Sequence, residues 1–117
     1  MENKYPEYLE HIKSLIVKLS KELPGPISGF NKLHKETLVE GALSIKIKEL
    51  IALAISISAG CEGCISYHVY DALRAGATRH EVLETIGVAI LMGGGPSMIY
   101  GAEAIDALDQ FEAKGVQ

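Results

Sequence analysis

The 117-residue sequence lacks tryptophan and has only two phenylalanines and two cysteines. Few large aromatic side chains are therefore available to fill the centre of a fold. At this length about two thirds of the surface can be buried on folding, so a core forms without disulfide staples. Lys and Arg number 11 against 15 Asp and Glu, the net charge is −4, and basic residues form no cluster beyond Lys46 and Lys48. Nothing in this charge pattern indicates a nucleic-acid partner.

Long apolar runs are also missing. The longest uncharged segments are residues 50–61 and 86–102; the first is too short to span a bilayer, and Gly93–Gly95 with Pro96 interrupt the second. The opening MENKYPEYLEHIK is charged and contains no apolar signal region. We therefore expect a soluble, cytoplasmic protein without a membrane partner. In a reducing cytosol, a pair of cysteines is more often catalytic or metal-binding than a permanent crosslink.

The alternation typical of strands is absent, whereas apolar residues recur at steps of three and four. This spacing predicts one all-α domain over residues 1–117 with about six helices. The expected helices cover roughly residues 8–19, 27–39, 44–58, 62–75, 78–90 and 96–113. Length and composition give no reason to expect a second domain.

Several residues mark where these helices begin and end. Ser44 can cap the third helix, and Thr78 with Glu81 forms a capping box that opens the fifth. Gly41 is expected to close the second helix. Gly76 follows the fourth as a left-handed C-terminal residue, and Pro96 suits the first turn of the sixth.

Two of the six predicted helices are apolar on almost every side, most clearly over residues 50–57. A domain of this size cannot easily enclose two such helices. We therefore expect a homo-oligomer that buries part of the third, fifth or sixth helix.

The segment SAGCEGCISYHVYD, residues 58–71, holds both cysteines and a histidine. Cys61 and Cys64 are three residues apart, close enough on a helix to form a reversible disulfide. A helix N-terminus at Cys61 favours a thiolate, and His68 shares the face of both cysteines. The pattern favours a redox dithiol. Two alternatives remain: a small disulfide staple, or a metal site completed by a fourth ligand among His34, His80 and Glu49.

Glu49 lies twelve residues before Cys61, on the preceding predicted helix. Leu53 and Ile57 continue its stripe, so its carboxylate can lie at the edge of the apolar core. Spacing alone favours a different interpretation, a solvated ion pair with Lys46 three residues earlier.

Together, Glu49, Cys61, Cys64 and His68 form the pattern E-x11-C-x2-C-x3-H. This pattern resembles the AhpD-like alkylhydroperoxidase signature of the carboxymuconolactone decarboxylase superfamily. The stretch from CISYHVYDALRAGATRHEVLE to the Gly-rich entry of the last helix is similar as well, and the resemblance covers about residues 30–112.

The resemblance implies an all-α antioxidant protein that assembles as a homo-oligomer, commonly a trimer or hexamer. It implies that Cys64 is the peroxidatic thiolate, that Cys61 is the resolving thiol, and that Glu49 and His68 form the proton relay. The relay requires a carboxylate at position 49, which reverses the preference for a solvated pair. The expected substrate is a hydroperoxide or a disulfide, with no metal or organic cofactor, and the thiol reductant is not identified.

Two features separate this sequence from AhpD itself. AhpD carries a histidine between its cysteines, next to the second, where this chain has Gly63, and this chain is shorter. Recycling by a lipoylated protein is therefore not implied. The alternative within the superfamily is a decarboxylase acting on carboxymuconolactone, but such enzymes lack the cysteine pair.

Overall fold

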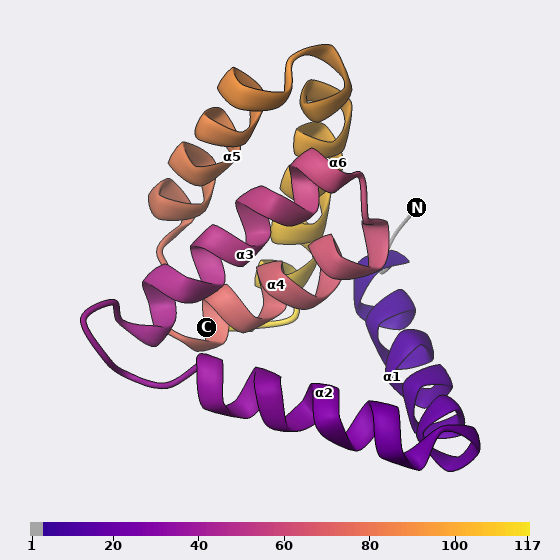
Figure 1. Cartoon of the computed structure of the whole chain (residues 1–117). Helices are drawn as coiled ribbons and strands as arrows, with labels where there is room; N and C mark the ends of the chain where they lie inside the picture. Colours follow the sequence, from indigo (N-terminus) through magenta and orange to yellow (C-terminus); the bar gives the residue numbers. More distant parts are fainter. Residues whose placement is uncertain (1–3) are drawn as a thin grey trace.

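The computed structural model describes residues 4–117; residues 1–3, which the predicted domain includes, lie outside this part. The described residues form six α-helices and no strand (Figure 1). They are α1 (Lys4–Glu22), α2 (Pro24–Thr37), α3 (Ile45–Ala59), α4 (Glu62–Arg74), α5 (Arg79–Gly93) and α6 (Gly95–Ala113). The predicted all-α fold with six helices is confirmed. None of these helices is long and apolar enough to cross a membrane.

Most predicted helix ends are confirmed by their hydrogen bonds. The Ser44 hydroxyl accepts a hydrogen bond from the Ile47 N–H at 3.1 Å. Thr78 and Glu81 form both hydrogen bonds of the capping box. Gly76 adopts a φ of +95° just after α4, a conformation that side chains other than glycine rarely take. Pro96 lies in the first turn of α6, where its missing N–H costs no helical hydrogen bond.

The second helix differs from its prediction at both ends. It begins at Pro24 instead of residue 27, because prolines fit the first turn of a helix, where N–H groups lack helical partners. It ends at Thr37, and the Leu38 N–H donates to the His34 carbonyl at 3.0 Å. Gly41, expected to close this helix, lies in the following loop instead.

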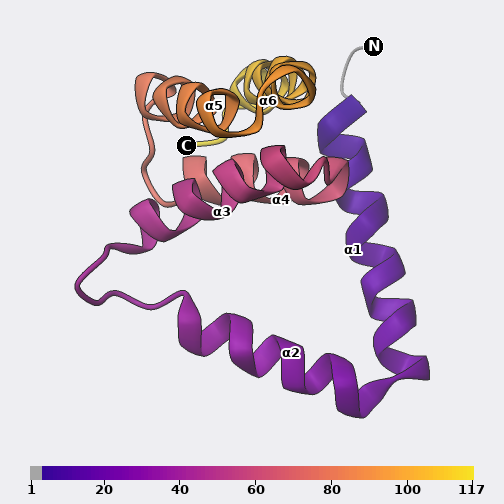
Figure 2. The same cartoon turned by 45° about the horizontal axis from the view of Figure 1, so that its top comes forward.

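Four of the helices form two packed layers, and a fifth lies along their edge. Figure 2 shows α3 and α4 in one layer and α5 and α6 in the other, with α1 descending along the edge. α1 packs on α4 and α6, while α3 packs on both α4 and α5. Between the layers lie fully buried aliphatic side chains: Leu53, Ile57, Ile65, Val69, Val82 and Leu108.

α2 stands apart from these layers, and we call it the arm (residues 24–37; Figure 2). It packs mainly on α1 and has no buried residue. Phe30 and Leu33, one turn apart, are 62% and 61% exposed. Within residues 4–117, these two apolar side chains of the arm therefore have little cover.

Glycine permits the close approach of α5 and α6. A Cβ atom added at Gly101 would lie 2.9 Å from Cγ2 of the buried Ile86 and 3.3 Å from Cδ1 of Ile90. The exposed Gly87 of α5, by contrast, has nothing within 4 Å of an added Cβ. The two helical glycines therefore differ in the space around them.

Gly101→Ala should lower the free energy of unfolding by about 1 kcal/mol or more, because a stiff, buried isoleucine must move to admit the methyl group. Gly87→Ala is the matched control and should raise it by about 0.5–1 kcal/mol through helix propensity. Urea denaturation at one protein concentration measures both. Equal effects of the two substitutions would contradict the close approach at Gly101.

Candidate functional site

The two cysteines lie where the chain turns from α3 into α4. Gly60 ends α3 with a φ of +68°, and the Cys61 N–H then donates to the Ser56 carbonyl at 3.0 Å. Cys61 is the N-cap of α4, and its sulfur accepts a hydrogen bond from the Cys64 N–H at 3.2 Å. The predicted helix N-terminus at Cys61 is confirmed.

Cys61 and Cys64 are joined in a disulfide, with Cα atoms 5.2 Å apart. This is the oxidised form of the predicted dithiol, and the same bond would exist in a purely structural staple. Because both sulfurs are bonded to each other, the three-ligand set of Cys61, Cys64 and His68 is not assembled in this form. The other histidines proposed as ligands, His34 and His80, are exposed on α2 and α5.

Glu49 is buried, with 5% of its surface exposed, and its Oε1 lies 2.8 Å from Nδ1 of His68. The contact joins α3 to α4 across nineteen residues of sequence. Against an ionised Glu49, Nδ1 carries the hydrogen of the neutral imidazole and donates it to the carboxylate. Nε2 then keeps its lone pair, so the ring can accept a proton on that side.

The solvated ion pair between Glu49 and Lys46 is wrong. Lys46 Nζ instead contacts Oε2 of Glu81 at 2.9 Å, joining α3 to the start of α5. That hydrogen bond, helped by the Thr78 N–H, lowers the pKa of the Glu81 carboxyl. Glu49 belongs to the buried residues of α3 and meets His68 on α4, whereas Lys46 meets the capping carboxylate of α5.

Asp71 is a member of this cluster that the sequence interpretation missed. A carboxylate oxygen of Glu49, a ring nitrogen of His68 and a carboxylate oxygen of Asp71 all lie within 4.8 Å of one another. Burial raises the pKa of the Asp71 carboxyl, and the negative charge of Glu49 raises it further. Asp71 follows His68 by three residues and Cys64 by seven, so helical spacing alone indicates the shared face.

Two tyrosines from other helices border the turn that carries the cysteines. An added Cβ at Gly63 would lie 3.7 Å from both the Tyr8 hydroxyl and Cδ1 of Ile12. At Gly60, an added Cβ would lie 3.0 Å from the Tyr100 ring. Helix α1 thus borders the position where AhpD has its histidine, at a distance of ordinary van der Waals contact. Local sequence spacing gives no signal of these contacts.

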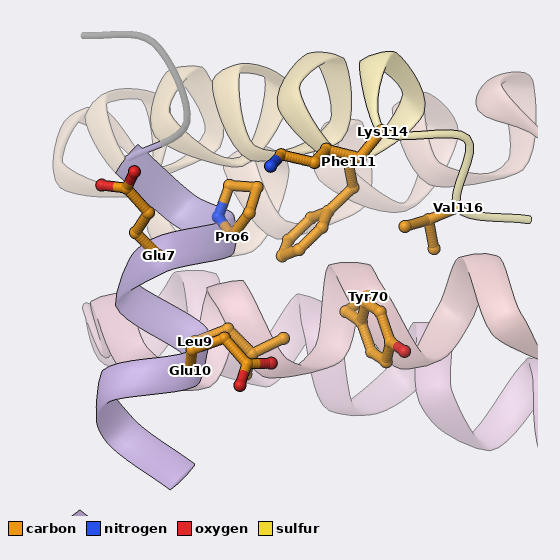
Figure 3. Close-up of a pocket in the computed structure, with 8 residues that line it drawn as sticks. All are labelled: Pro6, Glu7, Leu9, Glu10, Tyr70, Phe111, Lys114 and Val116. Carbon is orange, nitrogen blue, oxygen red and sulfur yellow. The ribbon is translucent and has the colours of Figure 1, made fainter. Parts of the chain in front are cut away.

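A surface pocket lies apart from these residues. It has a volume of about 410 Å³ and opens between α1, α4 and the C-terminal end of α6 (Figure 3). Tyr70 and Phe111 face each other in it, with ring centroids 5.5 Å apart. None of the four residues of the E-x11-C-x2-C-x3-H pattern lines it. The pocket therefore does not serve the disulfide.

The site as a whole combines a disulfide with a buried carboxylate that is bonded to a half-buried imidazole. Cys64 and His68 are one turn apart on α4, and Glu49 anchors the imidazole from α3. In the reduced form, such an arrangement supplies a thiol at a helix N-terminus and a base held in one orientation. Those are the groups that thiol nucleophile chemistry requires.

Comparison with known proteins gives consistent matches. The model of the carboxymuconolactone decarboxylase family matches residues 27–107. A carboxymuconolactone decarboxylase family protein from Legionella pneumophila has 41% sequence identity and a TM-score of 0.90, over 94% of this chain and 98% of that one.

A second solved structure, from Thermotoga maritima, is a family protein with a suggested part in the antioxidative response. It has 27% identity and a TM-score of 0.80, over 95% of this chain and 97% of that one. An uncharacterized protein of Cupriavidus necator is 36% identical over 95 residues, which cover 81% of this chain and 84% of that protein. The chain belongs to the carboxymuconolactone decarboxylase family.

Proposed function

We propose that the protein is an AhpD-like thiol oxidoreductase that reduces hydroperoxides, or exchanges disulfides, through Cys64 and Cys61. The observation that carries this proposal is the buried Glu49 carboxylate bonded to His68, on the helix that begins at the Cys61–Cys64 disulfide. A purely structural disulfide has no need of a buried acid–base pair. The suggested antioxidative part of the Thermotoga maritima relative points the same way.

In the proposed reaction, His68 takes the proton of the Cys64 thiol while Glu49 stabilises the resulting imidazolium. The Cys64 thiolate attacks the terminal oxygen of the hydroperoxide, the O–O bond breaks, and an alcohol leaves with the proton. Cys64 is then a sulfenic acid. The Cys61 sulfur attacks it, forming the disulfide and releasing water.

The cycle closes when an external dithiol reduces the disulfide and is itself oxidised. AhpD has a histidine at the position of Gly63, next to the second cysteine. Because this residue differs, we propose only that the reductant is a thiol compound or a thiol protein. This need for reducing equivalents is the reason we assign the protein to the cytoplasm.

The first test is intact mass after one equivalent of an organic hydroperoxide is added to the reduced protein. The wild type should lose two hydrogen atoms, and Cys61→Ala should gain one oxygen, because its sulfenic acid has no resolving thiol. Cys64→Ala is the control and should gain none at the same dose. An unchanged mass of both the wild type and Cys61→Ala, with thiols free at the start, would reject peroxidase chemistry.

The second test separates a relay from a structural contact. Glu49→Gln keeps the shape of the side chain but removes the charge that stabilises the imidazolium, so peroxide reduction should fall about 100-fold or more. The exposed Glu84 of α5 provides the control Glu84→Gln, which should retain full activity. Wild-type activity in a folded Glu49→Gln variant would show that the carboxylate takes no part.

We also propose that the protein forms a homo-oligomer. The sequence prediction placed the contact on α3, α5 or α6, which expose Ile55, Leu91 and Ile99, and we add that a second copy covers the arm. Phe30 and Leu33 are largely exposed on a helix with no buried residue. A helix of 14 residues with little tertiary packing is marginally stable in water, so its apolar side needs a surface to pack on. The family resemblance, which implies a trimer or a hexamer, supports a homo-oligomer.

Phe30→Asp should reduce the assembly to smaller species at micromolar concentration, because it adds a charge to the apolar side of the arm. The neighbouring exposed Asn31 provides the control Asn31→Asp, which should keep the wild-type mass. Light scattering coupled to size-exclusion chromatography measures both. A monomeric wild type would contradict the proposal.

A further inference from the structure

We propose that Asp71 is a positioning residue of the thiol site, which acts through His68 and Glu49 by adding a second carboxylate to their pair. This inference rests on the proposed thiol chemistry. It goes beyond the E-x11-C-x2-C-x3-H pattern, which does not contain Asp71.

The geometry is a triangle of acid and base. Glu49 approaches from α3, while His68 and Asp71 are three residues apart on α4. A carboxylate oxygen of each acid and a ring nitrogen of His68 all lie within 4.8 Å of one another. The contact between Glu49 and His68 is a 2.8 Å hydrogen bond. The imidazole therefore has a second carboxyl group close by, and that group is partly buried with it.

The charges around Asp71 show what it responds to. Glu49 on α3 repels its ionised form, whereas His68 on its own helix, Lys13 on α1 and His34 on α2 favour that form. Burial and Glu49 together outweigh the basic groups, which is why the pKa of Asp71 is raised. Asp71 thus shares the electrostatic field of the Glu49–His68 pair.

A second carboxylate changes how easily the site loses protons. Each proton that leaves Cys64 or His68 makes the site more negative, and a neighbouring ionised carboxylate opposes that change. Asp71 therefore keeps a proton on the imidazole after His68 has taken it from the thiol. That proton is the one available to the alcohol leaving group.

The test measures the alkylation rate of Cys64 by iodoacetamide against pH in reduced Cys61→Ala protein, which has a single thiol. Asp71→Asn removes the charge and retains the shape, so the midpoint of the pH–rate profile should move about one unit lower. Asp106→Asn is the control, on the exposed side of α6, and should leave the midpoint unchanged. Asp71→Glu should bring the midpoint most of the way back to the wild-type value, because it returns a carboxylate.

The Asp71→Asn variant should fold, because the pKa of Asp71 is raised in the folded state. The folded state holds the Asp71 proton more tightly than the unfolded chain does, so the ionised carboxyl lowers stability as the pH rises through its folded pKa. The variant should therefore be at least as stable as the wild type at neutral pH, with the difference disappearing in acid.

Glu49→Gln in the same single-thiol protein distinguishes the two proposals. A midpoint that moves in Glu49→Gln but stays at the Asp106→Asn value in Asp71→Asn would overturn the role of Asp71 and leave the relay intact. A midpoint that moves in neither would overturn both. A shift in Asp71→Asn that Asp71→Glu does not reverse would also overturn the proposal, because it would follow packing and not charge.

Discussion

A carboxylate buried in a helical bundle requires a hydrogen-bond donor, and for Glu49 that donor is the imidazole of His68. The contact fixes how α3 lies along α4, since both side chains leave their helices toward the shared interface. The remaining buried side of α3, with Leu53 and Ile57, then packs within the layers. The same contact that satisfies the buried charge also holds the imidazole in a single orientation. One hydrogen bond therefore belongs both to the packing of α3 on α4 and to the site.

The reactive turn at the start of α4 depends on backbone features. Gly60 takes a left-handed conformation, and the ring of Tyr100 lies 3.0 Å from the position that a Cβ atom would take. The chain can then reverse within one residue and present Cys61 as the helix N-cap. A thiolate at this end of a helix is stabilised by the free N–H groups and the helix dipole. The start of α1 is joined to the start of α4 by a 2.7 Å ion pair between Lys4 and Glu62.

The sequence predicted those features that depend on local spacing. Helix periodicity, the caps at Ser44 and Thr78, and the common face of Cys61, Cys64 and His68 all follow from steps of three or four residues. The partner of Glu49 did not, because Lys46 is its neighbour along the helix while His68 is its neighbour in space. The resemblance to a known signature supplied the tertiary contact that spacing could not.

Other features could not be predicted for the same reason. Tyr8 and Tyr100 reach the cysteine turn from α1 and α6, at separations that no local pattern encodes. Asp71 is different, since its spacing from His68 was visible. What the sequence did not disclose is its partial burial beside Glu49, and burial is what turns an ordinary surface aspartate into a group with a raised pKa.

Helix α1 links the arm to the cysteine turn. Its first half borders Gly63 through Tyr8 and Ile12, and its second half carries the exposed Leu15 and Leu19 toward the arm. A rigid helix of 19 residues transmits a displacement at one end to the other. The arm packs on α1, and Tyr8 and Ile12 of the same helix border the cysteine turn at Gly63. The position of α1 is therefore shared by the arm and by the turn that carries the cysteines.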